Sequence, residues 1–286
     1  MFGQRIIARS ISAARIIDQH GNVWQYHSRS DRHSKVACWV VLFDVLQRCA
    51  LLRRHVEEGK VAFGINHQMI DFRTDKRKDL DLVICVPRES GPEEGAGRWR
   101  SFADLAVEYG VVLEDRERDS LAVLPLFEQR PVGDVLVALE AKAAMTAHVR
   151  AAPRLFDELT SAFTCINGSS QHAVAAGLIM INAAPEFVSP DRNKKGFDAK
   201  LPEITTERQP NGAQVILNRV KKLRVRGHPT EHGFDAVGIF ALDMRNDGGN
   251  VSVAAIPEFP GVGDNYHYET MIMRIASIYE GRFQSR

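Results

Sequence analysis

The chain has 286 residues, of which 44% are hydrophobic and 26% are charged, and its formal net charge is +1 at pH 7. This composition is typical of a folded globular protein and excludes a disordered, collagen-like or coiled-coil chain. Because positive and negative charges nearly cancel, capture of nucleic acid or membrane by overall charge is also excluded, so any such binding must depend on local patches.

The hydrophobic pattern predicts helices that alternate with apolar strands, beginning with a surface helix in the Arg-rich first segment. In chain order we expect helices over 3–18 and 35–57 (with Ser34 as its N-cap), strands over 61–70 and 79–86, a loop over 87–97, a helix over 101–110, a strand over 135–139, a helix over 149–164, a strand over 174–182, a helix over 213–224, a strand over 234–243 and a helix over 265–283. Strands that are apolar throughout are typical of a sheet covered on both faces. We therefore expect an α/β fold, formed as a single domain over residues 1–286 with its core at about 35–245 and the first and last helices packed on it.

The cysteines and the apolar runs indicate the compartment. Cys38, Cys85 and Cys165 lie in apolar surroundings, and the four cysteines have no close spacing typical of a disulfide framework or zinc site. The longest apolar runs, 36–43 and 173–181, are far shorter than the roughly 20 residues that span a bilayer. We expect a reduced, cytoplasmic protein that does not cross a membrane.

Two carboxylates and a lysine lie at the ends of apolar strands. Asp81 directly precedes the apolar run 82–86, and Glu140 directly follows the run 135–139, with Lys142 two residues further on. Carboxylate oxygens are the ligands that Mg²⁺ prefers, and a nearby cation can orient an attacking water and stabilise developing negative charge. This combination points to metal-dependent hydrolysis of a phosphodiester.

The pattern of an acid, any residue and a lysine is common by chance and needs a structural context. Only the occurrence at Glu140 directly follows an apolar strand, whereas the other two lie in charged segments that we expect on the solvated surface. The three occurrences are Glu58-Gly59-Lys60, Glu140-Ala141-Lys142 and Asp198-Ala199-Lys200.

The lengths of the two apolar runs predict how the acids meet. If the two strands are antiparallel neighbours with Val86 opposite Val135, then Asp81 falls opposite Glu140 on one face of the sheet. Carboxylates opposed at the edge of an apolar sheet repel each other unless a cation joins them. We therefore expect a metal site between Asp81 and Glu140.

Asp79 is an alternative first acid. The same register places Asp79 opposite Lys142 and on the same face, because side chains on a strand alternate with a period of two. The segment between the two strands, 87–134, is long for a simple hairpin. The choice between Asp79 and Asp81 is open at this stage.

These residues resemble the PD-(D/E)XK nuclease superfamily, whose best-known members are type II restriction endonucleases. Asp81 matches the first acid of the motif, Glu140 the second acid and Lys142 the lysine, while Leu80 stands where a proline is often found. The order of the downstream elements is similar to that family's core. The resemblance implies a restriction-endonuclease-like three-layer α/β/α fold with a central mixed sheet.

The resemblance also implies the chemistry. Asp81, Glu140 and the main-chain carbonyl of Ala141 would bind Mg²⁺, and Lys142 would assist the attacking water, so that the catalytic residues are Asp81, Glu140 and Lys142. The expected substrate is double-stranded DNA, cut at a specific site to leave a 5′-phosphate. Because a palindromic site needs two active sites, a homodimer is expected. The resemblance to restriction systems also implies a cognate DNA methyltransferase that is encoded separately.

Two other functions agree with the same residues. One is a repair, recombination or defence nuclease that cuts without a fixed sequence. The other is a noncatalytic DNA-binding or interaction domain on the same fold. Three basic segments are candidates for phosphate contacts, although each can equally be a solvated surface. They comprise Arg29, Arg32, His33 and Lys35; Arg73, Lys76, Arg77 and Lys78; and Lys221, Lys222, Arg224, Arg226 and His228.

Overall fold

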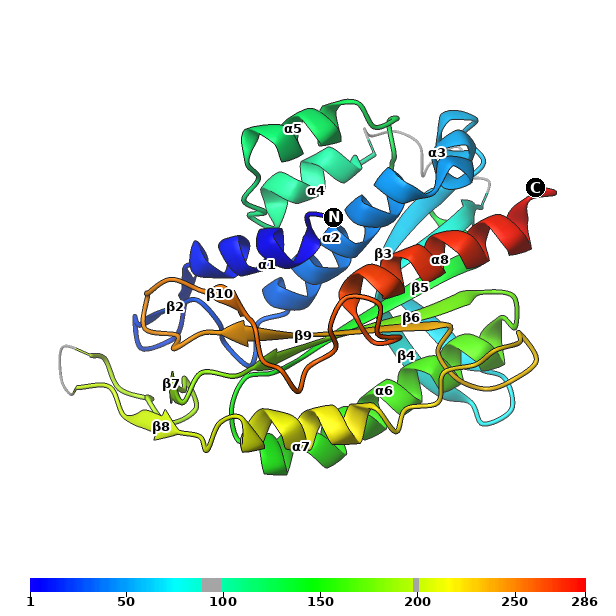
Figure 1. Ribbon diagram of the computed structural model, residues 1–286. Coiled ribbons are helices and arrows are strands. Elements are labelled where there is room, and N and C mark those ends of the chain that lie inside the picture. Colours follow the sequence, from blue (N-terminus) through cyan, green and yellow to red (C-terminus); the bar gives the residue numbers. More distant parts are fainter. Residues whose placement is uncertain (89–98, 198–200) are drawn as a thin grey trace.

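The computed structural model describes residues 1–88, 99–197 and 201–286, and a six-stranded mixed sheet lies at its centre (Figure 1). In spatial order the strands are β10 (Ser252–Ala254), β9 (Ala236–Asp243), β6 (Val174–Asn182), β5 (Val132–Ala144), β4 (Lys76–Pro87) and β3 (Ala62–Asp71). The three central strands β5, β6 and β9 are parallel, and the strands on either side of them are antiparallel to their neighbours. The mixed sheet predicted from the sequence is confirmed.

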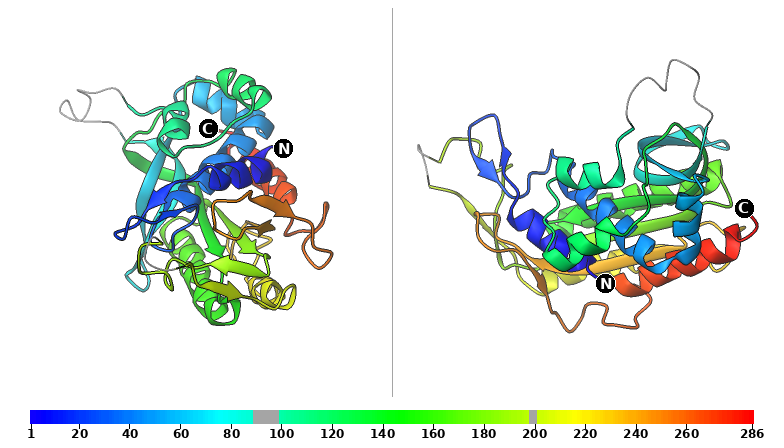
Figure 2. Two further views of the ribbon diagram at one scale, coloured as in Figure 1. Left: turned by 90° about the vertical axis from the view of Figure 1, so that its left-hand side faces the viewer. Right: turned by 90° about the horizontal axis from the view of Figure 1, so that it is seen from above.

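Helices cover both faces of this sheet (Figures 1 and 2). One face carries α1 (Gly3–Ser12), α2 (Arg32–Arg48), α3 (Ala50–Glu57) and α8 (Tyr268–Phe283), with α4 (Phe102–Glu108) and α5 (Asp115–Ala122) outside α2. The other face carries α6 (His148–Ser169) and α7 (Asn211–Val220). The fold is therefore α/β with a central mixed sheet between helices, an arrangement compatible with three α/β/α layers.

The core is divided by the sheet into two apolar clusters, one beneath α2 and α8 and one beneath α6 and α7. Helix α2 is buried on nearly every side because its middle is apolar all round, as in a helix that lies inside a protein. Trp39 of this helix stacks on Phe102 at 4.6 Å between ring centroids and donates its indole N–H to the Phe102 carbonyl. These contacts hold α4 against α2.

The helix expected over 35–57 is wrong in two details. It begins at Arg32 with Asp31 at its N-cap, so Ser34 is not the cap, and the Ser34 hydroxyl instead donates to the carbonyl of Asp31. It is also broken at Cys49, where the backbone is extended (ψ 100°) and the thiol accepts a hydrogen bond from the Leu52 nitrogen. The apolar pattern continues through the break, which is why the sequence predicted a single helix.

The first helix ends earlier than expected. Helix α1 stops at Ser12, and the chain then forms a short hairpin from β1 (Ile16–Ile17) and β2 (Val23–Trp24). The carboxylate of Asp18 accepts hydrogen bonds from the main chain inside the turn and from the Trp24 indole, which favours the hairpin over a longer helix. The isoleucines of α1 are buried against α2, whereas Arg5 is exposed, so α1 packs on the domain through one face as expected.

Short elements outside the main pattern were not predicted. Helix α5 lies in the long connection between β4 and β5, and β7 (Glu186–Val188) pairs with β8 (Ile204–Thr206) in a separate small sheet. Each is too short to give a clear period in the sequence. Residues 89–97 of the expected loop and the Asp198-Ala199-Lys200 segment lie outside the described residues.

Two further expectations concern cysteines and membranes. All four cysteines are buried and free. Within residues 1–88, 99–197 and 201–286, no helix is both long enough and apolar enough to cross a bilayer.

Candidate metal and nucleic-acid site

Asp81 on β4 and Glu140 on β5 lie side by side near the middle of the sheet. The ladder between the two antiparallel strands ends at Leu82 and Leu139, and the two acids are the next residues along their strands. Asp81 Oδ2 accepts a hydrogen bond of 3.0 Å from the main-chain nitrogen of Ala141. The structure therefore brings together the two acids that the sequence paired.

The expected register between β4 and β5 is found at the end of the ladder next to Asp81 and Glu140. Leu82 pairs with Leu139, as the prediction requires, but Val135 pairs with Cys85 and not with Val86. An irregularity just before Cys85 shifts the ladder by one residue at that end. If the pairing of Cys85 with Val135 were continued along the strands without this irregularity, Leu80 and not Asp81 would lie opposite Glu140. A one-residue slip of this kind moves every side chain to the other face of the sheet.

Glu140 is buried, with 1% of its side chain exposed, and two lysines neutralise it. Its Oε1 lies 2.7 Å from the Lys142 ammonium and 3.0 Å from the Lys78 ammonium. Both ammonium groups thus contact Oε1, whereas the buried Oε2 has no partner among the described residues. Lys142 is also 4.0 Å from Glu158 on α6, which lies over this face of the sheet.

Asp79, the alternative first acid, faces away from this cluster. Its carboxylate is exposed and accepts a hydrogen bond of 3.1 Å from the side chain of Gln68 on β3. The expected position opposite Lys142, sharing a face with Asp81, is not seen in the ladder of paired residues. The geometry favours Asp81 over Asp79.

An irregularity in β4 explains this difference. Leu80 packs into the cluster beneath α6, whereas Leu82 packs into the cluster beneath α2, although strict alternation would place them on one face. At the same point the ladder with β3 omits Asn66, whose φ of +50° is left-handed. The change of face points Lys78, in place of Asp79, toward Glu140. Lys78 belongs to the basic segment that precedes the acids in the sequence, but its contact with Glu140 was not expected from the sequence.

Burial and charge perturb the ionisable groups of the cluster. Burial, followed by the negative charge of Glu140, raises the pKa of Asp81 to about 6, despite the opposing hydrogen bond from Ala141 and the nearby lysines. Burial on its own lowers the pKa of Lys142, but Glu140 outweighs it and the net shift is upward. The lysine is therefore protonated, and the carboxylate pair carries a repulsion that a cation would relieve.

Asp81, Ala141 and Lys142 form the floor of a cleft of about 620 Å³. One wall is the segment that leads into α2, a second is the first half of α6, and a third follows β7. The exposed cations on these walls include Arg29 and Arg150, and neither has an ion-pair partner in the described part of the chain. The lining as a whole is balanced in charge, because four basic and four acidic side chains contribute to it, namely Arg29, Lys142, Arg150, Arg154, Asp31, Asp81, Glu158 and Asp191.

His33 stands on the wall of the cleft that leads into α2. Its ring packs against Tyr26 at 4.8 Å between centroids. Burial, followed by the positive charge of Lys142, lowers the pKa of His33 to about 4, so the imidazole is neutral at pH 7. Its Nδ1 is buried and has no hydrogen-bond partner among the residues that the structure describes.

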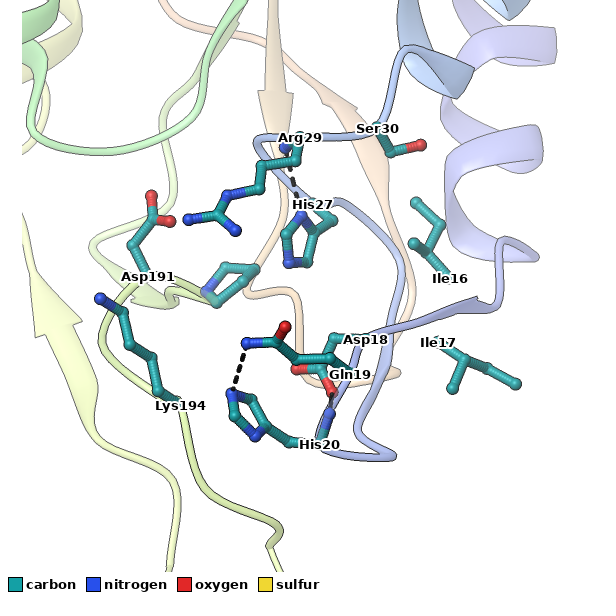
Figure 3. A pocket seen from close by; sticks show the side chains of 11 residues that line it. Ile16, Ile17, Asp18, Gln19, His20, His27, Arg29, Ser30, Asp191 and Lys194 are labelled. Atoms are coloured by element: carbon teal, nitrogen blue, oxygen red, sulfur yellow. Dashed lines mark hydrogen bonds between the residues drawn. The ribbon is translucent and has the colours of Figure 1, made fainter.

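A second hollow of about 370 Å³ adjoins the cleft, and the two share Arg29, Ser30, Pro190 and Asp191. Figure 3 shows the side chains of Arg29 and Lys194 lying on opposite sides of this hollow, with His27 between the hairpin and the opposite loop. Its cations are balanced by Asp18 and Asp191, so this hollow is less basic than its individual residues suggest.

The three basic segments differ in how many of their cations are paired or buried in the structure. In the first, only Arg29 is free in the cleft, because Arg32 donates to the Ser10 and Gly110 carbonyls and Lys35 pairs with Asp31. In the second, Lys78 contacts Glu140. In the third, Arg226 is buried and pairs with Asp235 at 2.6 Å, so it cannot line a groove with its exposed neighbours Lys221 and Lys222.

The donor set fits a hard divalent cation by its chemistry. It contains the carboxylate of Asp81, whose pKa is raised, and that of Glu140, whose buried Oε2 has no partner among the described residues, beside a main-chain carbonyl at Ala141. In the described residues no three side chains of His, Cys, Asp or Glu cluster as a metal site, and the proposed set requires only two.

Comparison of the chain with protein-family models, with curated proteins and with solved structures gives no match. A function can therefore be inferred only from the residues and geometry of this chain.

Proposed function

We propose that this chain is a Mg²⁺-dependent DNA endonuclease with a restriction-endonuclease-like fold, in which Asp81, Glu140 and Lys142 are the catalytic residues. One observation carries the proposal. Two carboxylates from neighbouring strands lie side by side at a cleft whose floor includes Asp81 and Lys142, and the buried Glu140 has one oxygen, Oε2, without a partner among the described residues.

Asp81, Glu140 and the carbonyl of Ala141 would hold Mg²⁺. When bound, the ion supplies a Lewis acid that polarises the phosphate and lowers the pKa of a water. The side chain of Lys142, which the structure holds protonated beside Glu140, would donate hydrogen bonds that orient the attacking water and stabilise negative charge. Arg29 and Arg150 on the cleft walls would contact the phosphates of the strand. The product would carry a 5′-phosphate.

The substrate we propose is double-stranded DNA, cut at a short specific site by a homodimer, with a cognate methyltransferase as a separately encoded partner. Two-fold symmetry of the protein matches the symmetry of a palindromic site. Digestion of a phage genome checks this: discrete bands support a fixed recognition sequence, whereas a smear supports a repair, recombination or defence nuclease.

Cleavage of supercoiled plasmid DNA with Mg²⁺ tests the site. We expect Glu140→Ala and Lys142→Met each to reduce cleavage at least about 100-fold, the scale on which single catalytic groups act. Lys60→Met is a matched control, because Lys60 belongs to the same acid–any–Lys pattern but pairs with Glu58 on the surface. If all three variants cut like the wild type, the site assignment is wrong.

Titration with Mg²⁺ or Ca²⁺ by calorimetry separates the nuclease from a noncatalytic domain on the same fold. A saturable heat that is lost in Glu140→Ala supports the metal site. A protein that binds DNA but shows no affinity for either ion, with or without DNA, would be a binding domain and not a nuclease.

A further inference from the structure

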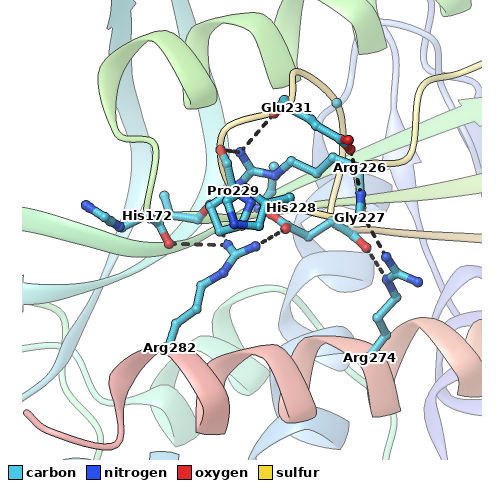
Figure 4. A network of polar contacts seen from close by, with 12 residues as sticks. His172, Arg226, Gly227, His228, Pro229, Glu231, Arg274 and Arg282 are labelled. Carbon is cyan, nitrogen blue, oxygen red and sulfur yellow. Dashed lines mark hydrogen bonds and ion pairs between the residues drawn. The ribbon is translucent and has the colours of Figure 1, made fainter.

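A second pocket, of about 470 Å³, lies between α8 and the loop that leads into β9. Three arginines line it: Arg226 from the loop, and Arg274 and Arg282 from α8 (Figure 4). The only acidic side chain among its lining residues is Asp235, at the start of β9. This pocket is separate from the catalytic cleft, with which it shares no lining residue.

Two of the three guanidinium groups share this one carboxylate. Arg226 lies 2.6 Å from Asp235 Oδ2, and Arg282 pairs with Oδ1 of the same residue. Arg274 has no carboxylate and donates instead to the main-chain carbonyls of Asp235 and Arg226. The lining therefore carries a surplus of positive charge. Glu231 at the rim accepts a hydrogen bond from the Gly227 nitrogen, and the surplus remains even when its charge is included.

The hydrogen-bonding capacity of Arg226 is also incompletely used. Its side chain is fully buried, and its terminal nitrogens donate to Asp235 and to the carbonyls of Ala173 and Pro229. Its Nε, however, is buried without a partner among the described residues. A buried donor without an acceptor is costly, and the cost is greater for a charged group. A structural clamp alone does not account for this donor or for the surplus charge.

We propose that this pocket binds a compact oxyanion of the phosphate type, held by Arg226, Arg274 and Arg282. Planar guanidinium groups recognise tetrahedral oxyanions through paired, charge-assisted hydrogen bonds. An anion here would offset the surplus charge and supply an acceptor for Arg226 Nε. The same chemistry is offered by free phosphate or a phosphate monoester and by the backbone of a nucleic acid, and the test distinguishes them. The proposal does not depend on the nuclease function.

Calorimetric titration of the whole chain with inorganic phosphate, at ionic strength matched with sodium chloride, tests the proposal. We expect one saturable site with a Kd of about 1 mM or lower and a rise in melting temperature that sodium chloride does not give. Substituting the arginines themselves could unfold the loop, so the variants are placed at the rim. Ser277 is exposed on α8 and lines the pocket.

Ser277→Glu adds a competing carboxylate, and we expect it to weaken phosphate binding at least about tenfold. Ser277→Gln has the same size without the charge, and Met273→Glu adds the same charge on α8 outside the pocket, where Met273 is 62% exposed. Both controls should bind within about twofold of the wild type. The absence of a saturable site in the wild type, or equal weakening by Ser277→Glu and Met273→Glu, would overturn the proposal.

A short DNA duplex supplies the second arm of the test. If free phosphate is the ligand, Ser277→Glu leaves the affinity for the duplex unchanged. If the pocket takes a backbone phosphate, Ser277→Glu weakens duplex binding more than Met273→Glu does. Either result supports an oxyanion site and identifies its source.

Discussion

Asp81 is held in an environment that disfavours its charge. Its pKa of about 6 lies above the usual value of 3.8, so the folded state binds the proton more tightly than the unfolded state. The ionised carboxylate therefore costs stability at pH 7, and this cost disappears as the pH falls toward 4. A functional site that destabilises its own fold is expected where a ligand later supplies the missing charge.

Asp81→Asn should stabilise the metal-free protein at pH 7 by about 1–2 kcal/mol, a figure reduced from the full pKa shift because the side chain is only partly buried. Urea unfolding at pH 7 and at pH 4 measures the effect, which should vanish at pH 4. The variant should also lose the rise in melting temperature that Mg²⁺ gives the wild type. Asp79→Asn, at an exposed position, is the matched control and should change stability by less than about 0.5 kcal/mol.

The pKa shift of His33 changes stability with pH in the opposite direction to that of Asp81. Its pKa of about 4 in the folded protein lies below the unfolded value of 6.5, so the unfolded chain binds a proton more readily between these two values. Stability therefore falls as the pH drops from 7 to 5, by at most about 2 kcal/mol from this residue. The groups that face the imidazole are Lys142, which disfavours protonation, and Asp31, which favours it.

His33→Gln should flatten this part of the pH profile of unfolding free energy. Urea unfolding at pH 7 and pH 5 gives the two points for each protein. His20→Gln, at an exposed position, measures the background of a solvated histidine. An equal loss of stability in the wild type and in His33→Gln between these pH values would show that His33 is not kept neutral by burial.

At the scale of elements, the strands that position the acids could be predicted because their apolar runs are uninterrupted. The run after Asp81 and the run before Glu140 are buried strands, and they pair in the expected direction. What could not be predicted is the change of face in β4. It depends on the backbone of Asn66 in β3 and on which cluster Leu80 enters, and neither is encoded in the local pattern of β4. The contact between Lys78 and Glu140 follows from that change.

The hairpin of β3 and β4 depends on a close approach to β5 at Gly64. A Cβ at Gly64 would lie 2.4 Å from Val132 Cγ2 and 3.0 Å from Val83 Cγ2, and these β-branched side chains cannot turn aside easily. We expect Gly64→Ala to destabilise the protein by about 1–3 kcal/mol. Because the hairpin carries Asp81, the variant should also weaken the stabilisation by Mg²⁺.

Gly281→Ala is the matched control for this substitution. Gly281 lies within α8, its added Cβ would meet no atom within 4 Å, and alanine favours a helix by up to about 1 kcal/mol. Thermal unfolding of the two variants should therefore shift in opposite directions. A loss of stability in both would indicate that the contact with Val132 is not the cause at Gly64.

At the scale of the whole molecule, the net charge of +1 leaves the direction of approach by nucleic acid undecided. We compare two faces with exposed cations: the cleft, with Arg29 and Arg150, and the end of α7, with Lys221 and Lys222. Helix α7 begins beside the first turn of α6 at the cleft and runs for 10 residues, about 15 Å, before it reaches the lysines. DNA bound at one of these faces can therefore contact one pair of cations without contacting the other pair.

If the cleft is the binding face, its cations set the salt dependence of DNA affinity. Each lost phosphate contact reduces the slope of log K against log salt by about 0.9 for duplex DNA. We expect the double variant Arg29→Ala/Arg150→Ala to reduce the slope by about 1–2, and Lys221→Ala/Lys222→Ala, which removes the same charge, to leave it unchanged. Fluorescence anisotropy with a duplex in Ca²⁺, over a range of salt concentrations, measures both slopes without requiring cleavage. A reduced slope only in the α7 variant would place the nucleic acid on the other face, away from Asp81 and Glu140, and would contradict the proposed nuclease.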